Sequence, residues 1–457
     1  MRSVELIVHK EVGQARIGEI IDSINKLQFG TGYLVPYIRG AEDIEVALFN
    51  PDVFVDGQPV EICGFAAASI LNKAIVLEER LKEDQYALTF LDFTHNHPML
   101  MSFPPEVIWT GRERGLNHWE KSLRRFIQFS SPGFSEKEID QLCGCIINAA
   151  AQYKMTYGFW SYIVNNSFKG ERLSKLLMEW VITTATKMRC KYLSGLNPII
   201  NAKTPGSVVL NHRVNLAYAA LVRDMEDAGL ETPQYFYTIQ LHSNMVQPDD
   251  WTNLLSEVVG YCRSALETTD MFSGIHIMVR NLENISKVVG RVRTMLKLFE
   301  ELNRIGYEYK LPVWWSNFGL IGLAVLDEGG DFASFTPNMA IKDIITEAGP
   351  VEKDHQFGKV LNIHAKELWE RKQTRKSRNR GYNLPKLNHF NTRNIPDDLE
   401  LESPPLYRRM FSKPYNIAAM NELSLMWREN IENGEIRPGR HYLRDFSPPF
   451  NVWGLDL

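Results

Sequence analysis

Polar side chains recur where short apolar runs of this sequence end, and their types are suited to acid-base chemistry. Asp92 and the pair His95 and His97 close one such run, His242 follows another, and Arg280 follows a third. Carboxylates and imidazoles can move protons when their pKa is tuned, and a guanidinium binds anions. We therefore predict a site in which Asp92 is the general base or nucleophile and His95 or His242 carries a proton.

Uncharged polar residues occupy equivalent positions after the other apolar runs. The predicted ligand-binding residues, besides Arg280, are Asn197, Gln240, Asn281, Asn317 and Ser334. Amides and hydroxyls both donate and accept hydrogen bonds, which suits a polar ligand such as a nucleobase or a sugar. Polar strand ends also occur simply because they border solvent, so ligand binding is a hypothesis.

The elements that would position these residues are short apolar runs alternating with helical segments. The runs are Tyr192–Leu196, Tyr235–Leu241, Ile275–Val279, Leu311–Trp315 and Phe332–Phe335. Between two of them, Val288, Val292, Met295, Leu296 and Phe299 have the spacing of one helix face. Strand and helix in strict alternation predict a parallel sheet.

Three further strands are predicted upstream, at Asp52–Asp56, Ala87–Phe93 and Phe126–Phe129, with a helix at 64–82 after the first. Eight strands in all favour an α/β fold, a (β/α)8 barrel of the TIM type, in which carboxyl-end loops converge on one face. An open doubly wound sheet is the alternative. No Gly-x-Gly-x-x-Gly motif follows a strand, which argues against its dinucleotide-binding version.

Three regions are predicted. Residues 1–45 form an N-terminal cap segment, residues 46–345 the barrel, and residues 346–457 an extended C-terminal arm with basic and aromatic stretches. Because aromatic residues anchor interfaces, the arm is predicted to pack along the barrel or to bind a protein partner.

Composition narrows the class of protein. The chain has 457 residues, 44% of them hydrophobic, and a net charge of −4, values typical of a globular protein. Its five cysteines do not form a disulfide framework, so a reducing cytoplasm is expected. No run approaches 18 apolar residues, so no membrane span is predicted.

The densest cluster of positive charge lies in the arm at residues 371–380. It contains Arg371, Lys372, Arg375, Lys376, Arg378 and Arg380, with no acidic residue. Cations that neutralise phosphates release counterions, so the cluster predicts nucleic-acid binding. A solvated linker, or pairing with the acidic run at residues 397–402, would explain the same residues.

The His95-Asn96-His97 sequence resembles the His-x-His of metal-dependent amidohydrolases. That resemblance implies a zinc site completed by a later histidine and a late aspartate, for which His242 and Asp331 are the candidates. An ordinary capped loop explains the same two histidines, and no metal or other cofactor is the main prediction.

The stretch Gly330-Asp331-Phe332-Ala333-Ser334-Phe335 resembles the end of tRNA-guanine transglycosylase-like barrels, which exchange a base in nucleic acid through a carboxylate nucleophile. Ser334 stands where the family has its nucleophilic Asp, and the Cys-rich zinc site is missing. The resemblance implies that Asp92 or Asp331 would take the carboxylate role, or that catalysis has been lost.

Two functions follow as hypotheses. The first is a barrel enzyme acting on a nucleotide or nucleic-acid base, with Asp92, His95, His242 and Asp331 as catalytic residues. The second is a non-catalytic scaffold that docks into a larger protein or nucleoprotein assembly through its aromatic arm. A metal-dependent hydrolase is a further alternative.

The basic cluster at residues 371–380 gives a direct test. Replacing its six cations by glutamine should remove nucleic acid that copurifies with the chain, whereas Asp92→Asn should retain it, because holding the polymer and acting on it use different residues. Mass spectrometry of the purified variants measures this. Equal nucleic-acid content in all variants would contradict a binding role for the cluster.

Overall fold

The computed structural model of the chain describes residues 32–38, 64–66, 90–92, 124–125, 127–128, 131–152, 167–187, 192–248, 251–280, 289–316, 318, 322–335, 427–435 and 439. For some of these, in particular Asp92 and Arg280, only the backbone is described.

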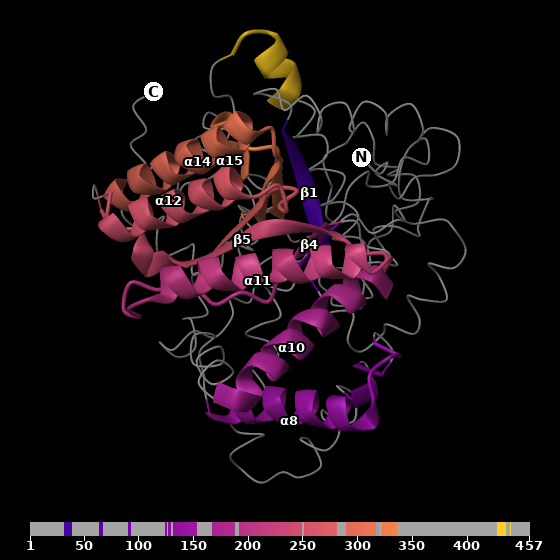
Figure 1. The fold of residues 1–457 in the computed structure, drawn as a ribbon. Helices are drawn as coiled ribbons and strands as arrows, with labels where there is room; N and C mark the ends of the chain where they lie inside the picture. Colours follow the sequence, from indigo (N-terminus) through magenta and orange to yellow (C-terminus); the bar gives the residue numbers. More distant parts are fainter. Residues whose placement is uncertain are drawn as a thin grey trace, which may run out of the picture.

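The best-formed part is a curled half-barrel of five parallel strands with helices between them. In chain order its elements are β4 (Tyr192–Ser194), α11 (Ser207–Asp227), β5 (Gln234–His242), the short 3-10 helix η3 (Ser243–Met245), α12 (Asn253–Thr268), β6 (Ile275–Arg280), α14 (Val289–Tyr309), β7 (Val313–Ser316), α15 (Gly322–Asp327) and β8 (Phe332–Phe335). Figure 1 shows α11, α12, α14 and α15 on the outer side of these strands.

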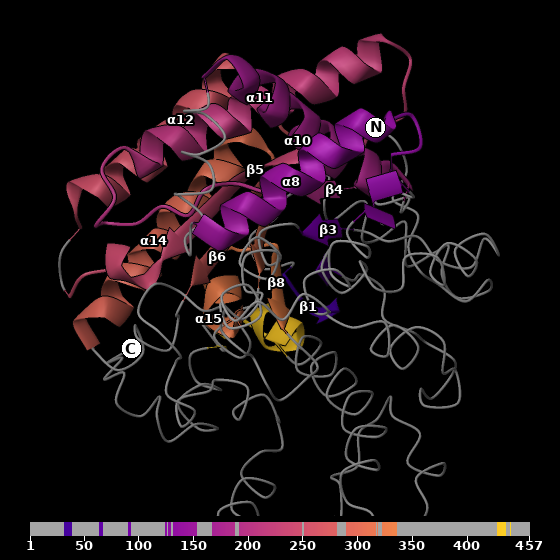
Figure 2. The same ribbon diagram turned by 90° about the horizontal axis from the view of Figure 1, so that it is seen from below.

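The remaining elements lie upstream. They are β1 (Tyr33–Ile38), β2 (Gly64–Ala66), β3 (Phe90–Asp92), α8 (Glu136–Gln152) and α10 (Ser167–Lys187). Hydrogen bonds join the strands in the order β1 to β8, and β1 also pairs with β8. α10 packs against both α11 and α8, and Figure 2 shows these helices from below.

The predicted regular (β/α)8 barrel is wrong. Helices alternate with strands over the half-barrel β4–β8, and among the described residues no helix lies between β1 and β2 or between β2 and β3. β2 and β3 have three residues each, so each contributes few backbone hydrogen bonds. The β-α alternation is therefore a property of the second half of the sheet.

The strand predictions are confirmed in that second half, and upstream the predicted strand Ala87–Phe93 contains β3. All five apolar runs from residue 192 onward form strands, β4 to β8. The predicted strand Phe126–Phe129 is wrong, because Ile127 and Gln128 are helical and Ser131 N donates to Ile127 O at 2.9 Å. A four-residue apolar run fits either structure.

The predictions for the first hundred residues have mixed outcomes. The helix predicted from residue 64 is wrong at its start, since Gly64–Ala66 is strand β2. Tyr33–Ile38, within the predicted cap segment, is strand β1. The predicted strand Asp52–Asp56 lies outside the described residues. None of the described helices is long and apolar enough to cross a membrane.

Strand register divides the side chains of the half-barrel between two faces. Trp315 of β7 donates from Nε1 to Asn303 Oδ1 of α14 at 2.8 Å, and Tyr235 of β5 donates to Asn215 Oδ1 of α11 at 3.0 Å. Because side chains alternate along a strand, odd-numbered residues of β5, β6 and β7 face the helices. Even-numbered residues face the concave side.

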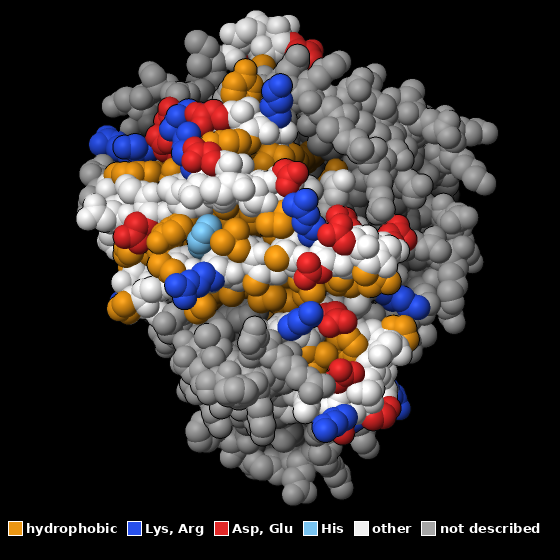
Figure 3. All heavy atoms as spheres, in the orientation of Figure 1, with side chains coloured by type: hydrophobic (Ala, Val, Ile, Leu, Met, Phe, Trp, Pro, Cys, Tyr) orange, Lys and Arg blue, Asp and Glu red, His pale blue; other side chains and the backbone are white. Residues whose placement is uncertain are grey.

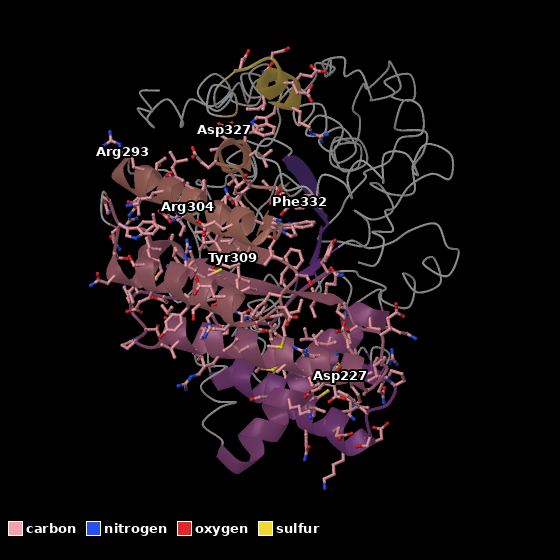
Figure 4. All side chains as sticks on the ribbon, turned by 45° about the horizontal axis from the view of Figure 1, so that its top comes forward. Asp227, Arg293, Arg304, Tyr309, Asp327 and Phe332 are labelled. Carbon is pink, nitrogen blue, oxygen red and sulfur yellow. The ribbon has the colours of Figure 1, made fainter. Side chains whose placement is uncertain are left out.

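A short helical turn at residues 427–432 packs on α15. Trp427 is fully buried, and its Nε1 donates to Asp327 Oδ1 at 2.8 Å. The same oxygen accepts from Gly439 N at 2.9 Å. In Figure 4, Asp327 lies at the end of α15 beside this turn. Trp427 and Gly439 are therefore both held to the end of α15 through Asp327.

Asn303 joins α14 to β7 and to the turn after α15. Its Nδ2 donates to Glu328 O at 2.9 Å, in addition to the bond from Trp315. We predict that Asn303→Ala lowers the free energy of unfolding by about 3 kcal/mol, since it removes the acceptor of the buried Trp315 indole N–H and the donor to Glu328 O. Chemical denaturation measures the change.

The control is Asn253→Ala, at the exposed start of α12. This substitution should change stability by less than about 0.5 kcal/mol. Equal effects of the two substitutions would contradict the role assigned to Asn303.

Candidate functional site

The concave face of the half-barrel carries a layer of buried, uncharged polar side chains. Thr238 and Gln240 of β5, His276 of β6, Ser316 of β7 and Ser334 of β8 are all at most 1% exposed. Interior positions of curled parallel sheets are mostly filled by branched apolar residues. Burying so many polar groups is costly unless they bind one another or a ligand.

Below this layer, toward the amino ends of the strands, the concave face is aromatic. The rings of Tyr192 and Phe236 lie 5.1 Å apart between centroids, as do those of Trp314 and Phe332. Burial raises the pKa of Tyr192 to about 12, so its phenol is neutral at physiological pH. The aromatic layer closes the amino end of the half-barrel, and the polar layer lies between it and the carboxyl-end rim.

The closest polar contact in the layer joins His276 to Ser316. His276 Nε2 lies 2.5 Å from Ser316 Oγ, and both side chains are buried. Neither residue is among the catalytic residues predicted from the sequence. The position of His276 in its strand was the available signal. Side chains two residues apart lie on the same face of a strand, so His276 shares a face with Met278, and the register partner of Met278 is Ser316.

His242 and Arg280 end neighbouring strands at the carboxyl-end rim. Register pairs His242 of β5 with Arg280 of β6, so the backbone brings these two predicted site residues side by side. The half-buried His242 accepts a hydrogen bond at Nδ1 from Asn244 N at 3.1 Å. In the neutral ring this leaves the proton on Nε2.

Two loops at this rim are fixed to each other. Asn244 Nδ2 donates to Asn201 Oδ1 at 2.8 Å, which joins the loop after β5 to the loop after β4. Ile200 N donates to Gln240 O at 2.7 Å, and His242 N donates to Ile200 O at 2.9 Å. His242 therefore sits on a rigid frame, as a ligand-contacting group requires.

The structure separates two other predicted site residues from this face. Asn197 is fully buried, and its Oδ1 accepts from Tyr235 OH at 3.2 Å on the helix-facing side; its Nδ2 has no hydrogen-bond partner among the described residues. Asp331 precedes β8 and so lies at the amino end of the strands, opposite the rim. We therefore leave Asp331 out of the candidate site.

Ser334 and Gln240 remain in the candidate site. Ser334 Oγ lies 3.5 Å from Trp315 O, at the limit of a hydrogen bond, and Gln240 occupies the concave face of β5. Asp92 ends β3 and pairs in register with Ser194 of β4, so its backbone lies at the carboxyl end as predicted.

Several predicted residues lie outside the described residues. These are His95 and His97 of the proposed zinc pair, Asn281, Asn317 and the six cations at residues 371–380. Within the part of the chain that the structure describes, no three His, Cys, Asp or Glu side chains gather as metal ligands do.

The outer surface of the half-barrel carries mixed charge. Figure 3 shows Lys and Arg interspersed with Asp and Glu over the helices. On α12 and α14, Arg263 and Arg304 both bind Glu308, at 2.7 and 2.9 Å. Exposed ion pairs of this kind contribute little stability, and mixed signs do not attract a phosphate backbone. We find no reason to place a nucleic-acid site on this surface.

Comparison with known proteins adds no family. No protein-family model matches the chain, and no curated protein matches its sequence. The resemblances to tRNA-guanine transglycosylase-like barrels and to amidohydrolases therefore stay predictions.

Asp331 is expected to affect stability rather than catalysis. Burial raises the pKa of its carboxyl group to about 7, a shift that the hydrogen bond from Val313 N, 2.9 Å, partly offsets. An unfolded aspartate has a pKa near ~3.9, so between about pH 4 and pH 7 the folded state holds a proton that the unfolded state has released. Stability therefore falls as the pH rises through this window.

The substitution Asp331→Asn keeps an acceptor for Val313 N and cannot ionise. We predict that it raises the melting temperature by a few degrees at pH 8 and leaves it unchanged at pH 4, as measured by thermal unfolding across this range. A difference from the unsubstituted chain that does not vary with pH would show that the carboxyl group has no raised pKa.

Proposed function

We propose that the chain is an enzyme that acts on a nucleobase within a nucleotide or nucleic acid. The observation that carries this proposal is the buried layer of amide, imidazole and hydroxyl groups on the concave face. Base edges present neutral donors and acceptors side by side, and such groups complement them. The five side chains of the layer, Thr238, Gln240, His276, Ser316 and Ser334, include no carboxylate, amine or guanidinium, so the layer suits a neutral ring better than an ion.

The roles follow from depth in the site. Gln240 and Ser334 would hold the edges of the base, above the aromatic layer of Trp314 and Phe332. His242, at the rim, would carry a proton between the ligand and solvent. A histidine suits that task because its ordinary pKa lies near neutral pH.

The charged roles fall on residues at the strand ends. Asp92 would act as general base or nucleophile, and Arg280 would hold a phosphate of the ligand. Asn281 and Asn317 would add contacts at the rim, and the cations at residues 371–380 would hold the polymer if the substrate is a nucleic acid. Reaction in a reducing cytoplasm fits the buried free thiols of Cys143 and Cys262.

One observation favours the alternative of a scaffold. The segment around Trp427 and Gly439 is anchored to Asp327 on α15, so the C-terminal region is tied to the outer layer of the half-barrel. A region held in this way could present a binding surface to a partner protein. In that case the polar layer would serve only to bind its own members together.

Calorimetry with free bases, nucleosides and simple sugars distinguishes these functions. We predict that a base or nucleoside binds, that sugars do not, and that Gln240→Leu weakens binding at least about tenfold, because a buried hydrogen-bond partner of the base is lost. The matched control is Thr184→Val on α10, which removes a buried hydroxyl bonded to Trp180 O far from the concave face.

The control should bind with unchanged affinity. The absence of binding by every base and nucleoside tested, or equal affinity for the Gln240→Leu variant and the unsubstituted chain, would refute the proposal. Preferential sugar binding would redirect it to carbohydrate chemistry.

A further inference from the structure

We propose that Ser316 is a nucleophile and that His276 is the base that activates it. Ser316 Oγ and His276 Nε2 lie 2.5 Å apart on neighbouring strands. A hydroxyl is a weak nucleophile until a neighbouring base removes its proton, and such a base must lie within hydrogen-bond reach. This pair meets that geometric condition, and it is separate from the roles given to Asp92 and His242.

The placement of the two residues along their strands supports the assignment. Ser316 is the last residue of β7 and lies at the depth of Gln240, one layer below His242 and Arg280 at the carboxyl-end rim, where a ligand would enter. His276 is the second residue of β6 and lies deeper, next to the aromatic layer. The hydroxyl thus lies between its base and the rim, the order that attack on an incoming group requires.

The substrate class is inferred to be a phosphate ester of a nucleotide, and this part rests on the proposed function. Arg280 ends the strand that carries His276, and a guanidinium there would bind the phosphate oxygens. A bond forms from Ser316 Oγ to phosphorus while the bond from phosphorus to the leaving oxygen breaks. The hydroxyl proton passes to His276 Nε2 and then to the leaving oxygen, and water later hydrolyses the phosphoserine.

A fluorophosphonate probe tests the activated hydroxyl without a known substrate. The full chain should be labelled at Ser316, with a phosphonyl group replacing the hydroxyl proton and fluoride leaving, as peptide mass spectrometry detects. His276→Gln keeps a hydrogen-bonding side chain but removes the base, so labelling should slow at least about 100-fold. Ser316→Ala should abolish it.

The matched control is Ser131→Ala. Ser131 is a buried serine whose Oγ lies 2.5 Å from the hydroxyl of Thr183, a partner that is not a base. This variant should label at the rate of the unsubstituted chain. Thermal unfolding of each variant shows whether it is folded.

A second variant keeps the proposal testable if Ser316→Ala does not fold. In Ser316→Cys the imidazole should stabilise a thiolate, so iodoacetamide should alkylate position 316 faster than the buried Cys143 and Cys262. Absence of fluorophosphonate label at Ser316, or equal labelling of the His276→Gln variant, would overturn the proposal and leave the pair a structural hydrogen bond.

The same experiment separates this inference from the proposed function. Protection of Ser316 from the probe by a nucleotide supports both. Labelling at Ser316 that no base, nucleoside or nucleotide slows would uphold the activated serine and refute the nucleotide substrate. Binding of a base without labelling at Ser316 would uphold the proposed function and refute the activated serine.

Discussion

The register of the parallel strands β4 to β8 is the constraint on which the rest of the structure depends. Side chains alternate between two faces along a strand, so a shift of one residue would exchange the faces. Trp315 and Tyr235 would leave their partners on the helices, and His276 and Ser316 would lose the concave side. The same pairing therefore determines both the core and the candidate site.

Buried amides make that register specific. Asn303 accepts from Trp315 and donates to Glu328 O, and Asn215 accepts from both Tyr235 OH and Thr238 N. Each of these bonds exists only when helix and strand are correctly aligned, and an unpaired group in the same place would be costly. Asn303 and Asn215 on the helix-facing side thus have structural partners.

The proposals for that layer rest on depth as well as on chemistry. Aromatic rings close the amino end, neutral polar groups lie in the middle, and His242 and Arg280 end their strands at the rim. A ligand entering from the rim would meet charge first and neutral hydrogen-bonding groups later. That order suits a nucleotide, whose phosphate is charged and whose base is neutral.

The sequence by itself determined the β-α alternation after residue 192, because each short apolar run there alternates with a strongly periodic helical segment. It also placed His242, Arg280 and Asp92 at strand ends. Only the tertiary structure showed that the regular alternation of strand and helix is limited to the half-barrel β4–β8. The reason is that a strand of three residues, such as β2, has too short a hydrophobic pattern to be recognised from the sequence. The tertiary structure alone paired His276 with Ser316, 40 residues apart, since that contact depends on the register of two strands rather than on any local motif.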